Sequence, residues 1–336
     1  MTLGMMFSVR VAVCTDLESN LLDACIDSIY AQDLSDNFEL SGVDLVVNRN
    51  LGPDNVQDLQ ALQEKFPSLL ISFEPKPGIP FARNKALQIA RRQGADLLAF
   101  IDDDCVADSD WLKHLVEGLI DFSVDASSGS WTIEPCEKPS PLVPRNIWGR
   151  RRYQFFGYPT KNGDRIPHAY TRNVIFKVKN AVSATGDLLY FDTSRVTLGG
   201  SDVIFFKEYS DVGNSIAYVE KAHVTEQYCS DRLTLRWHML RKIRNIQFII
   251  ERGLKGETLY FPRNAFGILV RLIALALGIK TASYRKPRAY SWPKLSFSLI
   301  GSMMIQVSQL VGILAFIMGI RHESYFSRRS RPKGQA

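Results

Sequence analysis

Three adjacent carboxylates, Asp102, Asp103 and Asp104, come directly after five apolar residues, 97–101. Like charges a few ångströms apart repel strongly where water is scarce, and a divalent cation relieves that repulsion. Asp102 and Asp104 are two residues apart, so they can point the same way from an extended segment. The triplet therefore predicts a Mg²⁺ or Mn²⁺ site that would bind a diphosphate and neutralise it as a leaving group. An acidic turn that caps a helix is the alternative, because Asp108 and Ser109 lie just downstream.

A second candidate site is the tetrapeptide Gly199-Gly200-Ser201-Asp202, which precedes a helix-like run, VIFFKEY. Paired glycines allow a tight turn and a close approach of the backbone to a ligand. Such a turn would present Asp202 at the start of a helix, where its carboxylate could act as general base toward an acceptor hydroxyl. An ordinary helix-capping aspartate explains the same residues, so the pattern by itself leaves both interpretations open.

The elements that must position these residues alternate over the first 125 positions. Four short β-rich runs predict strands, and each is followed by apolar residues at helical spacing. The predicted strands cover residues 9–14, 43–47, 69–73 and 97–101, and the predicted helices cover 19–31, 54–66, 80–93 and a segment after Ser109. Ser19 and Ser109 are the expected caps of two of these helices. Four such units in a row predict an α/β, Rossmann-like doubly wound sheet with ligands at the carboxyl ends of its strands.

The second half of the chain is less regular. Residues 135–170 are rich in proline, glycine, arginine and aromatic residues, which predicts a functional loop region that includes the acceptor site. A strand is predicted over 171–178 and a basic helix over 233–250.

Charge is divided unevenly along the 336 residues. Residues 1–140 contain 10 lysines and arginines against 23 acidic residues, whereas 141–336 contain 31 against 12. The acidic half suits cations, and the basic half suits phosphate or an anionic membrane surface. We expect no nucleic-acid partner, because the basic residues alternate with long apolar stretches instead of forming a solvated patch. The five cysteines are scattered without a CxxC pair, which predicts reduced thiols, and the N-terminus shows no signal-peptide pattern.

Two apolar stretches follow Pro262. Residues 265–279 contain one arginine, and residues 295–320 contain no charge over 26 positions, which is long enough to cross a bilayer. A polar stripe follows one face of the longer stretch and is made of Ser298, Ser302, Gln306 and Gln309. The stripe favours a packed or in-plane helix over a lone span, and basic clusters on both sides favour the cytoplasmic face of a membrane. Completion of a soluble core is the alternative.

Several segments, in this order, resemble family 2 glycosyltransferases with the GT-A fold. The resemblance is greatest to bacterial polysaccharide enzymes of the succinoglycan type that add single sugars. The matching segments are VAVCT (11–15), EPKPGIPFARNKAL (74–87), LLAFIDDDCVADSDWL (97–112), TRNVIF (171–176), GGSD (199–202), EQYCSDRLTLRW (226–237) and the tail ILAFIMGIRHESY (313–325). The resemblance implies an inverting transfer, in which an acceptor hydroxyl displaces the nucleoside diphosphate from the anomeric carbon of a nucleotide-sugar.

For the metal, the resemblance implies three carboxylates. Asp102 would contact the donor ribose or the metal, and Asp104 would bind the metal on the diphosphate. Glu226 falls near a position where relatives often place a histidine or glutamate that completes the metal shell.

For the donor and the acceptor, the resemblance implies roles for five further residues. Asp202 occupies the position of the base, and Thr15 ends the first strand where the nucleotide base usually rests. Arg83 and Asn84 form a pair that helps to hold the donor, although Arg83 could equally be a solvated helix residue. Asn48 stands where an aspartate commonly bonds the uracil, and an amide can still bond a pyrimidine edge.

Two other positions depart from the family pattern. Ser201 replaces the glutamate of the usual GGED sequence. Processive synthases have QxxRW, but here Leu233 stands at the glutamine position before Arg236 and Trp237, which predicts an enzyme that adds one sugar.

These observations predict a catalytic domain over residues 1–250, with a donor half (1–125) and an acceptor half (126–250), and a membrane-associated helical tail over 251–336. The expected partners are a nucleotide-sugar such as a UDP-sugar, a lipid-linked or glycan acceptor in envelope polysaccharide synthesis, and an anionic membrane surface at the cytoplasmic face of the inner membrane. A sugar-phosphate nucleotidyltransferase is disfavoured, because the segment after the first strand, CTDLESN, contains no glycine. A catalytically degenerate relative that binds membranes or partner proteins remains the other alternative.

Overall fold

The computed structural model describes residues 6–49, 53–151, 154–155, 158–196, 199–254 and 292–320. The chain divides into two units. The first comprises Met1–Ile133, Arg150–Val196 and Gly200–Gln227, and the second comprises Glu134–Gly149, Thr197–Gly199 and Tyr228–Ala336. The basic helix that we expected to end the catalytic domain belongs to the second unit.

The first unit begins with the predicted alternation of strands and helices. The strands are β1 (Phe7–Thr15), β2 (Phe38–Val47), β3 (Leu69–Phe73) and β4 (Leu97–Asp102). The helices are α1 (Leu22–Tyr30), α2 (Pro53–Lys65), α3 (Ile79–Arg92) and α4 (Trp111–Asp121), with the short strand β5 (Cys105–Ala107) before α4. The four predicted βα units are confirmed.

The two predicted serine caps are wrong. Leu21 is the N-cap of α1 and Asp110 is the N-cap of α4, and neither makes a side-chain capping hydrogen bond. Ser19 lies in the turn before α1, where its hydroxyl accepts a hydrogen bond from the Leu21 N–H at 3.2 Å. The cap preference acts at any turn of the chain, so it does not by itself locate where the helix begins.

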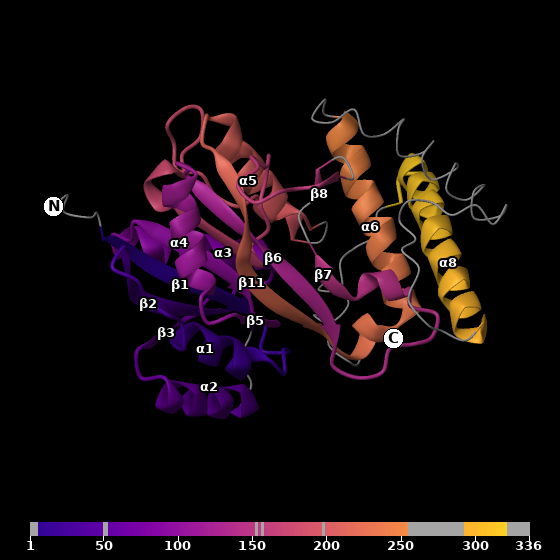
Figure 1. The fold of residues 1–336 in the computed structure, drawn as a ribbon, viewed down its shortest axis with the longest axis horizontal. Coiled ribbons are helices and arrows are strands. Elements are labelled where there is room, and N and C mark those ends of the chain that lie inside the picture. Colours follow the sequence, from indigo (N-terminus) through magenta and orange to yellow (C-terminus); the bar gives the residue numbers. More distant parts are fainter. Residues whose placement is uncertain are drawn as a thin grey trace. The chain divides into compact units, whose positions relative to one another are not determined.

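The strands form a mixed sheet with the order β3-β2-β1-β4-β10-β6-β11-β5 (Figure 1). β1 pairs in parallel with β2 and β4, and β2 pairs in parallel with β3. β10 (Asn173–Lys177) is antiparallel to β4 and to β6 (Ala126–Pro135), and β11 (Ile216–Tyr228) is antiparallel to β5. β1 lies between β2 and β4, so the chain continues from β1 to one side of the sheet and returns later to the other side. The carboxyl ends of β1 and β4 therefore border the crevice where such sheets bind ligands.

Both faces of the sheet are buried. Val9, Val11 and Val13 of β1 pack with residues of α1, α2 and α4, whereas Ala12 packs with α3 and α5 (Ser201–Asp211). Successive side chains of a strand point to opposite faces, so one strand serves both layers. Burial on both faces explains the apolar run 97–101, whose side chains are at most 2% exposed.

One ion pair is buried within the sheet. Arg10 on β1 donates to both carboxylate oxygens of Asp44 on β2, at 2.8 Å from Nε and 2.6 Å from Nη2. Gly42 provides the space, because a Cβ atom there would lie 2.5 Å from Arg10 Nη1. Burial raises the pKa of Asp44, and Arg10 offsets part of that rise.

The predicted loop region of residues 135–170 contains short elements. They are η1 (Arg145–Ile147), β7 (Gly149–Arg151), β8 (Gln154–Phe155) and β9 (Tyr158–Pro159). Three further short helices follow along the chain: η2 (Val178–Asn180), η3 (Thr193–Arg195) and η4 (Ser230–Leu233).

The second unit is built on α6 (Leu235–Leu254) and α8 (Trp292–Ile317), which pack against each other through Ile246, Ile250 and Ile313. Gly312 permits this approach, since a Cβ atom there would lie 2.4 Å from Ile246 Cγ2. Among the described residues, the segment Ile300–Ile317 is long and apolar enough to cross a membrane, with a mean hydropathy of 1.8. The predicted stretch 265–279 lies outside the described residues.

Cys136 and Cys229 form a disulfide in the second unit, across 93 positions of the sequence. The prediction of reduced thiols was therefore wrong for these two residues. Cys14, Cys25 and Cys105 are free, as predicted.

Candidate active site

The acidic triplet lies where the carboxyl ends of β1 and β4 meet. The parallel register places Cys14 opposite Asp102, so Thr15 is next to the triplet. The Thr15 hydroxyl donates to Asp103 Oδ2 at 2.6 Å, and the Ser19 hydroxyl donates to the Asp103 carbonyl oxygen at 2.9 Å. Asp103 thus joins the two strand ends. The sequence analysis predicted no role for this residue. The Thr15 hydroxyl, expected near the nucleotide base, is already used in this junction.

Asp102 is half-buried and lies among other carboxylates. Burial raises its pKa to about 6; the guanidinium groups of Arg83 and Arg172 lower this pKa, and the carboxylates of Asp104 and Glu226 raise it. The positive charge of these two arginines thus offsets only part of the rise in the pKa of Asp102 that burial and the neighbouring carboxylates cause. A bound divalent cation would supply the missing positive charge.

The donor atoms at this edge of the sheet fit Mg²⁺ or Mn²⁺. Asp102 and Asp104 offer carboxylate oxygens, which these hard cations prefer. In the part of the chain that the structure describes, no three histidine, cysteine, aspartate or glutamate side chains are grouped so as to hold an ion by themselves. Mg²⁺ is commonly bound by one or two carboxylates and completes its shell with substrate phosphate and water, so the pair is sufficient.

Glu226, the third expected metal ligand, comes close to the triplet through strand pairing. β11 places it opposite Cys105 of β5, and the neighbouring Gln227 N–H donates to the Asp104 carbonyl oxygen at 3.1 Å. Its side chain is 5% exposed and is paired with the Arg172 guanidinium. Because Arg172 contacts Oε2, a metal bound by Glu226 would share this carboxylate with the arginine.

Arg172 is the residue of the site that the sequence analysis missed. Besides pairing with Glu226, its guanidinium carbon lies 4.9 Å from the ring centroid of Trp131 and 5.8 Å from that of Tyr170. These rings hold the guanidinium beside the acidic cluster. The available signal was its position directly before an apolar strand, within the segment already matched as TRNVIF.

Arg83 joins the triplet to the second predicted site. It lies on α3 with 9% of its surface exposed, which rules out a solvated helix arginine. Its Nη1 donates to the Ser201 hydroxyl at 3.0 Å, while its charge lowers the pKa of Asp102. Ser201, the departure from the family sequence, is therefore the partner of a donor-side arginine.

Asp202 is the second residue of α5. Gly199 and Gly200 have φ angles of +73° and +78°, a conformation that favours glycine, and Gly200 is the N-cap. The interpretation of Asp202 as the capping residue is therefore wrong. Its Oδ1 accepts a hydrogen bond from the Val203 N–H at 2.9 Å, and its side chain is half-buried. A partly exposed carboxylate in the first turn of a helix can accept a proton from a bound hydroxyl group.

The two asparagines hold loops in this structure. Asn48 Nδ2 donates to the carbonyl oxygens of Glu74 (3.0 Å) and Lys76 (2.7 Å), and its Oδ1 accepts from the Gly78 N–H at 2.8 Å. Both N–H donors of Asn48 are thus used, so a bond from this amide to a nucleotide base would have to be accepted by the second lone pair of Oδ1. Asn84 similarly bonds both the N–H and the carbonyl of Phe191, at 2.7 and 2.9 Å.

Comparison with known proteins adds three findings. The family model described as Glycosyl transferase family 2 matches residues 10–180. The succinoglycan biosynthesis protein ExoM of Rhizobium meliloti (strain 1021) is 26% identical over 241 residues, which is 71% of this chain and 73% of ExoM. The mannosyltransferase PcManGT from Pyrobaculum calidifontis, solved in complex with GDP-Man and Mn²⁺, has a TM-score of 0.56 and 18% identity, over 91% of this chain and 87% of its own. At that identity the likeness concerns the fold, and it confirms the predicted GT-A architecture.

Proposed function

This chain belongs to glycosyl transferase family 2, and on that premise we propose that it is an inverting, metal-dependent enzyme that moves one sugar from a nucleotide-sugar to a glycan or lipid-linked acceptor in envelope polysaccharide synthesis. The observation that carries the proposal is the half-buried Asp102 beside Asp104 at the carboxyl end of β4. Burial and the neighbouring carboxylates hold the pKa of Asp102 near 6 despite two arginines, so the site favours an added cation.

In the proposed reaction an acceptor hydroxyl oxygen attacks the anomeric carbon of the donor. The bond from that carbon to the diphosphate oxygen breaks, its electron pair leaves with the diphosphate, and the hydroxyl proton passes to the Asp202 carboxylate. A Mg²⁺ or Mn²⁺ bound by Asp102 and Asp104 would offset the charge of the departing diphosphate. Arg83 holds the first turn of α5 through its hydrogen bond to Ser201. This bond would position Asp202, the proposed general base, relative to the donor.

Two bases, uracil and guanine, are candidates for the donor nucleotide. Family resemblance suggests a UDP-sugar, whereas the relative PcManGT binds GDP-Man. Both N–H donors of Asn48 hold the 74–78 loop, so this amide would contact a base only as an acceptor. ExoM, a succinoglycan biosynthesis protein, supports a polysaccharide product. Leu233 in place of the processive glutamine supports the addition of a single sugar.

We also propose that α8 attaches the enzyme to the cytoplasmic face of the inner membrane. Where the structure describes side chains of α8, the well-exposed ones are apolar: Ile300, Met303, Met304, Val307, Val311, Leu314 and Ile317. The opposite side of the helix packs on α6. Basic residues flank the helix in the sequence and suit anionic headgroups.

Calorimetric titration of UDP and of GDP, each with and without Mn²⁺, tests the metal and the donor together. We expect one nucleotide to bind in a Mn²⁺-dependent manner and Asp104→Asn to weaken that binding at least about tenfold. Asp108→Asn, an exposed aspartate four positions further along, is the matched control and should bind as the wild type does. Equal binding with and without Mn²⁺ would refute the metal site, and binding without turnover of any nucleotide-sugar would favour the degenerate alternative.

A further inference from the structure

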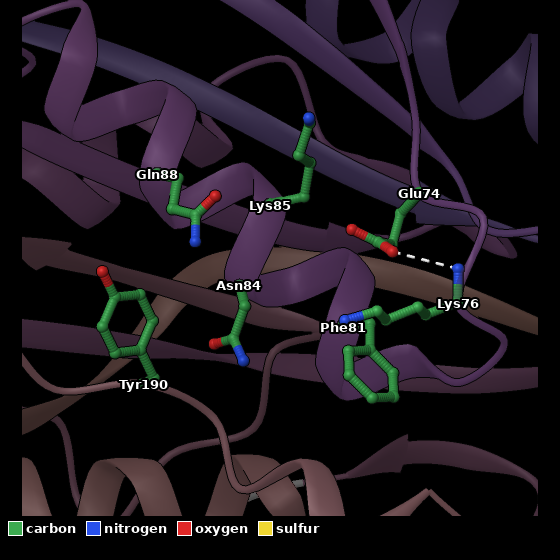
Figure 2. A pocket seen from close by; sticks show the side chains of 7 residues that line it. All are labelled: Glu74, Lys76, Phe81, Asn84, Lys85, Gln88 and Tyr190. Atoms are coloured by element: carbon green, nitrogen blue, oxygen red, sulfur yellow. Dashed lines mark hydrogen bonds between the residues drawn. The ribbon is translucent and has the colours of Figure 1, made fainter.

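A pocket of about 350 Å³ lies on the outer side of α3, in the first unit. Figure 2 shows Phe81, Asn84, Lys85 and Gln88 along one side of the helix, with Tyr190 facing them from a neighbouring loop. Glu74 and Lys76 close the other end of the pocket. The volume falls within the range of about 300–1,000 Å³ that is usual for small-molecule sites.

This pocket is separate from the acidic triplet. Residues 81, 84, 85 and 88 recur at helical spacing and form one stripe, whereas Arg83 lies on the opposite side of the helix and turns toward Asp102 and Ser201. The α3 residues that pack on the sheet are Ala82, Ala86 and Ala90, which are fully buried. A ligand in the pocket would therefore contact the outer side of α3, away from the reacting groups.

The walls of the pocket are fixed before any ligand arrives. The two hydrogen bonds between Asn84 and the backbone of Phe191 anchor the loop that carries Tyr190. Arg91 donates to the carbonyl oxygens of Ala181 (2.8 Å) and Leu189 (3.1 Å), and its guanidinium lies 5.0 Å from the Tyr190 ring centroid. Tyr190 is thus an aromatic residue that is 39% exposed yet held in place, which lowers the entropy cost of binding to it.

The side chains in the pocket combine aromatic and charged groups. Lys76 Nζ lies 5.7 Å from the Phe81 ring centroid. Among the described contacts, the Lys85 ammonium and the Gln88 amide make no hydrogen bond, so both remain available to a ligand. Two lysines face one carboxylate, that of Glu74, whose Oε1 accepts from the Lys76 N–H at 3.0 Å.

We propose that this pocket is a second carbohydrate site, for a saccharide that carries a carboxylate. A pyranose ring presents an apolar C–H face that can cover the exposed ring of Tyr190, and its hydroxyl groups suit the amide of Gln88. The carboxylate pairs with the ammonium group of Lys85, which makes no hydrogen bond within the described residues. A general polyanion site is disfavoured, because the carboxylate of Glu74 also lines the pocket.

Titration of the donor-free, full-length protein with a hyaluronan tetrasaccharide and with uncharged cellotetraose tests the proposal. We expect the charged tetrasaccharide to bind more tightly, and Lys85→Glu and Tyr190→Ala each to weaken its binding at least about tenfold. Lys113→Glu changes a lysine of α4, which packs on the other face of the sheet, and should leave the binding unchanged. Circular dichroism of each variant checks that it folds.

Three outcomes would overturn the proposal. They are binding that neither pocket variant weakens, equal binding of the two tetrasaccharides, and complete displacement by inorganic phosphate at constant ionic strength, which would indicate a simple anion site. The titration contains no nucleotide-sugar and no metal, so its failure would leave the proposed transfer reaction untouched. Sugar transfer to a short acceptor should in turn be unchanged in Lys85→Glu.

Discussion

At the scale of single residues, the pair of Arg172 and Glu226 would limit the carboxylate oxygens that a bound metal can use. Arg172 holds Glu226 next to the triplet and supplies part of the positive charge that Asp102 requires. A cation bound by Asp102 and Asp104 would interact with the same carboxylates as the Arg172 guanidinium does, so each would reduce the stabilisation that the other provides. The arginine therefore stabilises the metal-free protein, and the metal can replace part of that effect.

Replacing Arg172 should make the folded state depend on the metal. In Arg172→Met the Glu226 carboxylate stays buried and loses the ion pair with Arg172, and loss of one partner of a buried pair costs about 3–5 kcal/mol. Without metal, the Tm of Arg172→Met should lie below that of the wild type. Addition of Mn²⁺ should raise the Tm of the variant by more than it raises the Tm of the wild type. Lys177→Met, at the end of the strand that follows Arg172 and paired with the more exposed Asp125, is the control. Equal Mn²⁺ stabilisation of wild type and Arg172→Met would argue against this competition.

Asp202→Asn tests the proposed base directly. The amide keeps the shape of the side chain and cannot accept the acceptor proton, so transfer should fall by about 10²–10⁴-fold. Mn²⁺-dependent binding of the nucleotide should stay within twofold of the wild type, about the scatter of such measurements. Asp211→Asn, at the other end of the same helix and paired with Lys207 at the surface, should transfer at the normal rate. An active Asp202→Asn enzyme would refute the assignment.

At the scale of elements, Asp125 joins strands that are far apart in the sequence. It precedes β6; its Oδ2 accepts from the Ser215 N–H (3.0 Å) and hydroxyl (3.1 Å), and its Oδ1 accepts from Lys177 (3.1 Å) and Asn180 (3.0 Å). Burial by itself would raise the pKa of Asp125, but the hydrogen bonds from Ser215 and Lys177 outweigh it and hold the pKa below its usual value.

This depressed pKa sets the pH dependence of one contribution to stability. A carboxyl group whose pKa is lower in the folded state stabilises that state above its unfolded pKa of about 3.9, and the contribution is lost as the pH falls through the folded value. We expect Asp125→Asn to lower the free energy of unfolding by about 1–3 kcal/mol at pH 7, and by progressively less below about pH 4. Urea denaturation of both proteins across this pH range measures the difference. Asp121→Asn, exposed at the end of α4, should show none of it.

The elements themselves were largely predictable from the sequence. Apolar runs such as 97–101 and the helical spacing of the segments between them reflect burial within one element, so local patterns reveal the four βα units. The pairs that complete the site are not local. Arg172 and Glu226 are 54 positions apart, and Cys136 and Cys229 are 93 apart. No periodicity links such residues, because strand order and register decide which of them meet.

The same limit applies to the residues matched by family resemblance. Thr15, Asn48 and Asn84 lie near the predicted strand and helix ends, but the structure uses their side chains to hold Asp103 and two loops. A sequence pattern indicates that a polar group stands at an edge of the sheet. It does not indicate whether that group faces a ligand or the protein's own backbone, because both arrangements satisfy the same hydrogen-bonding requirement.

At the scale of the whole molecule, charge and apolar surface are distributed in a way that suits work at a membrane. The acidic residues concentrate in the half that contains the triplet, and the basic residues concentrate in the half that contains α6 and α8. A helix whose exposed side chains are apolar costs free energy in water, so α8 is expected to have a partner. Flanking lysines and arginines favour an anionic lipid surface over an apolar protein groove.

Vesicle sedimentation of the full-length protein tests this expectation. We predict that it sediments with vesicles that contain phosphatidylglycerol and much less with phosphatidylcholine vesicles, because the flanking basic residues contribute about 1 kcal/mol each near an anionic surface. Val307→Asp combined with Leu314→Asp places two carboxylates on the exposed side of α8, at side chains that are 47% and 58% exposed, and should release most of the protein. Val56→Asp alters a comparably exposed valine of α2, at 42%, and should sediment as the wild type does. Retention of the α8 variant on the vesicles would show that the attachment lies elsewhere in the chain.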